Sequence, residues 1–116
     1  MIQIKRIYEQ PHSDDGYRIL IDRLWPRGFT RERAKGDLWM KEIAPSTELR
    51  KWYHHNPDRW NEFRSRYQAE LTEKKELILQ IEHLEKVHGT LTLLFAAREK
   101  EQSQAAVLIN LLIEQS

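Results

Sequence analysis

The chain has 116 residues, of which 40% are hydrophobic and 32% charged, and its formal net charge is +1. This length suits one domain with a single core, and the balanced charge excludes a basic field spread over the whole surface. Cysteine is absent, which excludes disulfides, thiolate catalysis and cysteine-based metal centres.

The chain shows no membrane or export signal. No apolar run approaches about 18 residues, and the first residues lack the continuous apolar core of a signal peptide. No linker or repeat divides the sequence. We therefore expect a cytoplasmic protein that forms a single domain over residues 1–116 and does not span a membrane.

The first third of the chain predicts strands joined by turns. Residues 2–8 are rich in Ile and alternate at first, which is typical of a strand with one wetter face. Residues 14–16, Asp-Asp-Gly, predict a turn. Residues 18–24 have a continuous apolar centre, which favours a strand covered on both faces, and residues 25–28 end it. Residues 37–43 fit either a short strand or one helical turn.

The middle of the chain predicts helices. Ser46 is a good N-cap, and Glu48 follows in the first turn, where the helix dipole favours it. Asn56 and Pro57 predict the N-cap and first residue of the next helix. A gap in the apolar spacing at residues 72–75 predicts a break or kink. The aromatic residues predicted to lie in the core are Trp52, Trp60, Phe63 and Tyr67.

The last third predicts a helix end, a strand and a final helix. Gly89 is placed to end the preceding helix. Residues 90–97 predict a second buried strand, and Ser103 is placed to cap the last helix. The apolar stripe expected to face the core consists of Ala105, Leu108, Ile109, Leu112 and Ile113.

Strands near both ends, with helices between them, predict an α/β fold: a single compact domain with a small, mainly parallel sheet flanked by helices. A mixed sheet is the alternative, because the link from Tyr8 to Tyr17 is too short for a helical crossover of about a dozen residues. Either the first two strands pair antiparallel, or an extended link returns along the sheet.

Four segments carry a resemblance to a known family. They are Asp15–Gly28 (DGYRILIDRLWPRG), Ile43–Ser46 followed by Leu49–Trp52, His55–Phe63, and Thr92–Arg98. In this order and spacing they resemble the YeaO-like proteins of the domain of unknown function 488 superfamily, over about residues 5–112. The resemblance implies a compact α/β cytoplasmic protein and implies no particular reaction.

Other branches of that superfamily tend to carry a Cys-His-Arg element after the last strand. Residues 98–104 contain neither Cys nor His. The resemblance therefore does not imply the sulfur transfer of rhodanese-like domains.

Ligands in open α/β sheets bind beyond the carboxyl ends of the strands. If the two buried strands are parallel, the loops after them bring Arg23, Arg27 and Arg98 to one edge of the sheet. Guanidinium groups match carboxylate and phosphate groups, and the helix that begins at Ser103 adds free backbone N–H groups there. This pattern predicts a pocket for a small anionic ligand, phosphate- or carboxylate-bearing.

Three neighbouring residues complete the predicted ligand-binding set. Asp22 is costly to bury unpaired. The interpretation we favour is that it pairs with Arg23 or Arg27 and so orients them, and the alternatives are a metal ligand or a general base. Trp25 is the aromatic residue best placed to stack on a flat ligand, and Gly28 permits a positive φ or close approach of the backbone to a ligand.

Whether a reaction follows binding stays open, because no nucleophile is recognisable. The chain has no glycine-rich phosphate loop and no Gly-x-Ser-x-Gly motif, and Ser46 is explained as a helix cap. The histidines lack metal-ligand spacing. We therefore expect no catalytic residue that can be named, no metal and no cofactor.

The alternative function uses the basic surface of residues 27–66. Residues 17–67 contain 12 Lys and Arg against 7 Asp and Glu, so this region could contact the phosphates of nucleic acid in a transcription-regulatory protein. The alternation of Arg59 and Arg66 with Glu62 is typical of a solvated helix face, which makes nucleic acid the less favoured partner. The Leu- and Ile-rich final helix leaves self-association into a homo-oligomer open.

Overall fold

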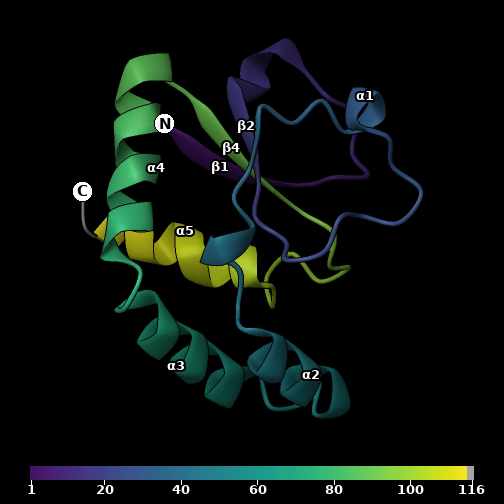
Figure 1. Ribbon diagram of the computed structural model, residues 1–116, viewed down its shortest axis with the longest axis vertical. Coiled ribbons are helices and arrows are strands. Elements are labelled where there is room, and N and C mark those ends of the chain that lie inside the picture. Colours follow the sequence, from purple (N-terminus) through teal and green to yellow (C-terminus); the bar gives the residue numbers. More distant parts are fainter. Residues whose placement is uncertain (115–116) are drawn as a thin grey trace.

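The computed structural model describes residues 1–114, and these contain a four-stranded sheet in which all neighbouring strands are parallel (Figure 1). The strands are β1 (Ile2–Arg6), β2 (Tyr17–Leu20), β3 (Leu38–Trp39) and β4 (Leu91–Phe95). Their order across the sheet is β1-β4-β2-β3. The predicted α/β class with a mainly parallel sheet is confirmed.

The first two strands are not neighbours, because β4 lies between them. The link of residues 7–16 runs back to the start of β2, through a short 3-10 turn at Ser13–Asp15. Gly16 ends the link with φ +65°, where a Cβ atom would lie 2.2 Å from the carbonyl oxygen of Thr90. Of the two alternatives for this link, the returning extended link is confirmed and antiparallel pairing of the first two strands is wrong.

Five helices lie within the described residues: α1 (Arg31–Ala34), α2 (Thr47–His55), α3 (Trp60–Leu71), α4 (Lys75–His88) and α5 (Gln104–Glu114). The break predicted at residues 72–75 is confirmed, since it separates α3 from α4. Gly89 ends α4 with φ +82°, as predicted. Residues 37–43 contain both of the expected alternatives, β3 and a 3-10 turn at Lys41–Ile43.

The prediction that a helix begins at Asn56 is wrong. Asn56 ends α2 instead: its backbone N–H donates to the carbonyl oxygen of Tyr53, and its side-chain Nδ2 donates to that of Trp52 at 2.8 Å. The next helix begins only at Trp60, after Arg59. The side chain of Asn56 is thus bound to the preceding helix and does not cap the following one.

The strands are also shorter than predicted. β2 ends at Leu20 and β4 at Phe95, although the pairing continues for one residue because Ile21 N–H donates to the carbonyl oxygen of Leu94 at 3.0 Å. Beyond that point, the backbone N–H of Ala96 donates to a side chain, that of Asp22. The sheet therefore ends where a side chain replaces a backbone partner.

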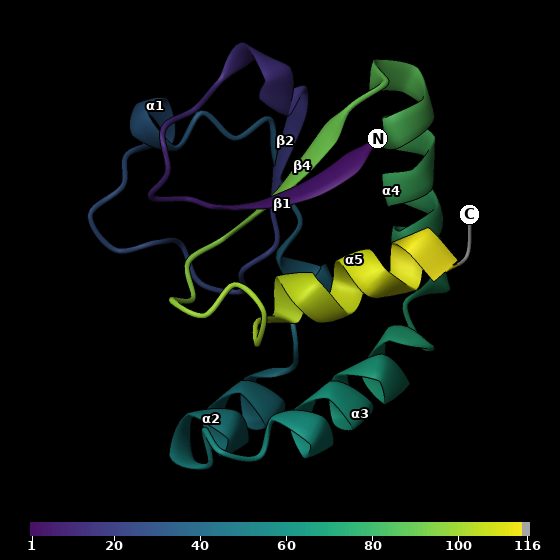
Figure 2. The ribbon, with the colours of Figure 1, turned by 180° about the vertical axis from the view of Figure 1, so that it is seen from behind.

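Helices cover one face of the sheet. Helices α4 and α5 contact the strands, α3 packs on α5, and α2 packs on α3, further from the sheet (Figures 1 and 2). Phe63 and Tyr67 are buried as predicted, while Trp52 and Trp60 are half-buried against the same core. In the predicted stripe of α5, the residues that are buried are Ala105, Leu108 and Leu112, whereas Ile113 is 58% exposed.

The other face is covered mainly by irregular chain. Ile7, Leu20, Ala34 and Leu94 form its core, with the rings of Trp25, Phe29 and Trp39 packed against them. In Figures 1 and 2, the long loops and the short α1 lie on this side of the strands. The two central strands are therefore buried on both faces, as predicted for the apolar centre of residues 18–24.

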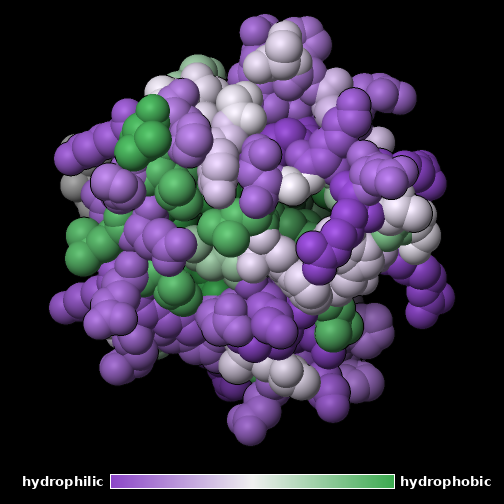
Figure 3. All heavy atoms as spheres, turned by 45° about the horizontal axis from the view of Figure 1, so that its top comes forward, coloured by the Kyte–Doolittle hydropathy of each residue, from purple (hydrophilic) through white to green (hydrophobic). Residues whose placement is uncertain are grey.

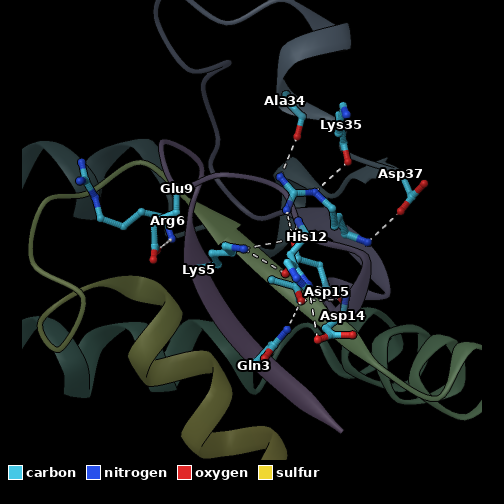
Figure 4. Close-up of polar contacts among 12 residues, drawn as sticks. Gln3, Lys5, Arg6, Glu9, His12, Asp14, Asp15, Ala34, Lys35 and Asp37 are labelled. Carbon is cyan, nitrogen blue, oxygen red and sulfur yellow. Dashed lines mark hydrogen bonds and ion pairs between the residues drawn. The ribbon is translucent and has the colours of Figure 1, made fainter.

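A buried ion-pair network fixes the returning link to the sheet (Figure 4). Arg18 on β2 donates to the carboxylate of Asp15, and to the carbonyl oxygens of Ala34 and Lys35 at 2.9 Å each. Lys5 on β1 reaches the same carboxylate at 3.1 Å. Burial acts to raise the pKa of Asp15, but the backbone N–H of His12 and these two cations together hold that pKa below its ordinary value.

Candidate functional site

A cavity of about 460 Å³ lies beyond the carboxyl ends of β2 and β4. Its walls come from residues 22–27 after β2, residues 96–97 after β4, and residues 102–104 at the start of α5. Residues 44–45 and the side chains of α2 and α3 close the remaining side. Its volume is in the range of small-molecule sites, and it lies at the sheet edge that the sequence indicated.

Asp22 lies in the wall of this cavity. One carboxylate oxygen accepts from the backbone N–H of Ala96 at 2.9 Å, and the other accepts from the side-chain amide of Gln104. The backbone carbonyl of Asp22 accepts from the indole of Trp39 at 2.7 Å. Burial raises the pKa of Asp22 to about 6, against the two hydrogen bonds to the carboxylate, which act to lower it.

The expected pairing of Asp22 with an arginine is wrong. Arg23 turns the other way: its Nε donates to the carbonyl oxygen of Pro45 at 3.0 Å, and its Nη2 donates to that of Ala44 at 3.1 Å. Lys74 donates to the same Ala44 oxygen at 2.9 Å. Arg23 therefore anchors the segment before α2 while it lines the cavity.

Two further arginines line the cavity, and both are exposed. Arg27 comes from the loop after β2, as predicted. Arg50 comes from α2 and was missed by the sequence reasoning, because only the packing of α2 brings it to this edge. Ser103 caps α5 as predicted: its Oγ accepts from the backbone N–H of Ala106 at 3.3 Å and donates to the carbonyl oxygen of Lys100 at 2.9 Å.

The other predicted site residues are only partly brought together. Trp25 lines the cavity, and its indole N–H donates to the carbonyl oxygen of Phe29 at 2.6 Å. Gly28 has the expected positive φ, +82°, but does not line the cavity. Arg98 is exposed and also lies outside the lining. Arg23 and Arg27 therefore line one cavity, whereas Arg98, which follows β4, lies outside its lining.

Several cations of the basic region have local partners. Arg59 and Arg66 both pair with Glu62, and Arg66 also lies over the ring of Trp52 at 4.2 Å from its centroid. Arg33 lies over the ring of Phe29 at 4.8 Å. The alternation of charge on α3 is thus an exposed ion-pair face, as the sequence indicated.

A smaller hollow of about 250 Å³ lies between α3, α4 and α5, and it is lined largely by aliphatic groups such as Leu71, Ile78 and Leu111. Leu79 of α4 also lines this hollow and is 64% exposed, and Val87, further along α4, is 61% exposed. On the face drawn in Figure 3, hydrophobic side chains gather on the side where α4 lies, with hydrophilic ones between them. Self-association through the last helix stays a prediction.

The fold and the cavity together define a small parallel α/β domain with a candidate ligand site at the carboxyl edge of its sheet. Among residues 1–114, no helix is both long enough and apolar enough to cross a membrane. The chain belongs to the family DUF488-N3i, described as the inactive DUF488-N3 subclade, whose model matches residues 1–116. This membership confirms the resemblance found in the sequence.

Two relatives illustrate the match. The chain is 43% identical over 113 residues to the uncharacterised protein Rv3073c of Mycobacterium tuberculosis (strain H37Rv), an alignment that covers 96% of this chain and 92% of the relative. It is 44% identical over 107 residues to the uncharacterised protein YeaO of Escherichia coli K12, covering 92% of each. The comparison with solved structures gives no match.

Proposed function

We propose that this protein binds a small molecule bearing a carboxylate or phosphate group, in the cavity at the carboxyl edge of the sheet. One observation carries the proposal: within the described residues, three arginines and one carboxylate line the same cavity of about 460 Å³. The N-terminus of α5 opens on the same space and adds its positive dipole end.

The arginines have different parts in this proposal. Arg23 is committed to two backbone carbonyls and fixes the wall. Arg27 and Arg50 are exposed, so their guanidinium groups can turn to an acid group, which they would bind with two parallel N–H donors. The ring of Tyr53, stacked on Phe63 at 4.3 Å between centroids, and Trp25 supply apolar surface for the body of the ligand.

The residues of the cavity fit a role in binding better than a role in catalysis. The Ser103 hydroxyl is engaged at both its donor and its acceptor positions in capping α5. Residues 98–104 contain neither Cys nor His. The description of the family as an inactive subclade agrees with a domain that has kept a pocket and carries out no reaction.

Nucleic-acid binding has weaker support. Its surface would include Arg59 and Arg66, which already share the carboxylate of Glu62. A salt-dependent interaction with single-stranded DNA near physiological ionic strength would favour nucleic-acid binding. This interaction should be measured together with the ligand titrations.

The test is an NMR titration of the ¹⁵N-labelled protein with benzoate, phenyl phosphate and inorganic phosphate. We expect saturable shifts at residues 22–27 and 102–104 at concentrations up to about 10 mM, which covers millimolar binding. Replacing both Arg27 and Arg50 with Gln should weaken binding about tenfold or more, because each loses a charge-assisted hydrogen bond. Arg64→Gln, on the exposed face of α3, is the matched control.

Two results would overturn the proposal. One is the absence of saturable shifts with all three probes. The other is binding that the double variant leaves as strong as in the wild type, since the arginines would then have no part in it.

A further inference from the structure

Asp22 presents a carboxylate to the cavity in which an anion is proposed to bind. Both of its hydrogen-bond partners, Ala96 and Gln104, line that cavity as well, so the carboxylate lies at the wall. A bare anion against this wall would be repelled by like charge. The ligand must therefore keep its acid group away from Asp22 or offer it something complementary.

The carboxylate has unused hydrogen-bonding capacity. A carboxylate offers about four lone-pair sites, and the protein fills two of them, one on each oxygen. No Lys, Arg or His of residues 1–114 forms an ion pair with Asp22, although Arg23, Arg27 and Arg50 line the same cavity. A partly buried carboxylate without a cation is costly, so a cationic donor from the ligand would relieve that cost.

We infer that the ligand is a zwitterion: a compact amino acid or amino-bearing acid whose nitrogen donates to Asp22 while its carboxylate or phosphate meets Arg27 and Arg50. This inference rests on the proposed function, because it assigns the second end of the same ligand. In this inference the arginines of the cavity bind the acid group of the ligand, and Asp22 binds its amino group. The volume of about 460 Å³ accommodates a ring with a charged group at each end.

A matched pair of probes tests the inference. 4-(Aminomethyl)benzoate and 4-methylbenzoate share the ring and the carboxylate, and only the first carries an ammonium group. In the wild type we expect the amino probe to bind about tenfold more tightly or better, the size of effect that a charge-assisted hydrogen bond produces. In Asp22→Asn this advantage should vanish, while 4-methylbenzoate should bind at least as tightly as before. Asp58→Asn, which changes an exposed carboxylate in the turn between α2 and α3, is the matched control.

Each outcome separates the two proposals. If both probes bind the wild type equally, the inference falls and the anion site stands. If the amino probe keeps its advantage in Asp22→Asn, then Asp22 is not its receptor and the inference also falls. If neither probe binds while phenyl phosphate does, the anion site stands and the inference falls. If phenyl phosphate, inorganic phosphate and benzoate also give no saturable shifts, the proposed function falls and takes the inference with it.

A measurement on the wild type alone covers the case in which the variant fails to fold. The advantage of the amino probe should shrink as the pH is lowered from 7.5 to 5, because a protonated Asp22 no longer attracts an ammonium group. The other ionisable side chains that line the cavity are those of Arg23, Arg27, Arg50 and Tyr53, and burial raises the pKa of Tyr53 above its ordinary value. A preference that does not change with pH would overturn the inference.

Discussion

Replacing Asp22 with Asn should make the protein more stable at neutral pH than the wild type. Burial raises the pKa of Asp22 from 3.8 to about 6 in the folded protein. Between these values the folded state holds a proton that the unfolded state has released, so the free energy of unfolding falls as the pH rises. The contribution of protonated Asp22 to the free energy of unfolding is fully present below about pH 3.8 and is lost by about pH 6 to 7.

The size of the effect follows from the shift in pKa. The rise in the pKa of Asp22 from 3.8 to about 6 corresponds to about 3 kcal/mol in the free energy of unfolding, because a tenfold change in an equilibrium constant is about 1.4 kcal/mol. Asn matches the protonated acid in shape and is neutral at every pH. Its Oδ1 can accept from Ala96 N–H, and its Nδ2 can donate to Gln104 once that side-chain amide rotates. The variant should therefore equal the wild type near pH 4 and exceed it by about 3 kcal/mol at pH 7.5.

The assay is urea unfolding followed by tryptophan fluorescence from pH 4 to 7.5, with the linear extrapolation made at each pH. Other carboxylates also titrate in this range, so the informative quantity is the difference between the curves of variant and wild type. Asp58→Asn, which changes an exposed carboxylate, should give a small difference that does not grow with pH. If the Asp22→Asn and wild-type curves run parallel, the carboxylate is not destabilised by burial and the reasoning is refuted.

Two further predictions concern the returning link. Gly16→Ala should lower the free energy of unfolding by about 3 kcal/mol or more, because its Cβ would lie 2.2 Å from a backbone carbonyl oxygen and its φ is +65°. Gly36→Ala, at a position with open space around it, is the control. Equal losses of stability in the two variants would refute the close approach at Gly16. Asp15→Asn should cost about 3 kcal/mol or more in the same assay, because it leaves the buried guanidinium of Arg18 without a counter-charge. The Asp14 side chain is 89% exposed, so Asp14→Asn should hardly change the free energy of unfolding. An equally small loss in Asp15→Asn and Asp14→Asn would contradict a structural role for the ion pair of Asp15 and Arg18.

The place of the site could be predicted from the sequence because it depends on local signals. A continuous apolar run marks a buried strand, and parallel strands share their carboxyl ends, so the residues at the ends of segments 18–24 and 90–97 and just after them were expected at one edge. The N-cap at Ser103 could be predicted for the same reason, since an N-cap depends on only a few neighbouring residues. These signals located Arg23, Arg27 and the start of the last helix at the cavity.

The partners within the site could not be predicted, because they come from distant parts of the chain. Asp22 bonds to Ala96 and Gln104, which are 74 and 82 residues away, and charge alone pointed to the nearer arginines. Arg50 reaches the cavity only because α2 packs on α3 and the carbonyls of residues 44–45 are fixed by Arg23. Such contacts depend on the path of the chain between helices and strands. The spacing of apolar residues predicts the helices and strands themselves but does not predict that path.

Asp22 contributes to both the shape and the charge of the cavity. The last backbone bond between the central strands runs from Ile21 to Leu94, and at the next step the side chain of Asp22 takes the N–H of Ala96. The backbone after residue 22 is then free to leave the sheet, which opens the space that Arg27 enters. Asn keeps an oxygen for that N–H and removes only the charge. A variant that retains the anion site and loses the preference for an amine would therefore separate the residue's part in building the cavity from its part in selecting the ligand.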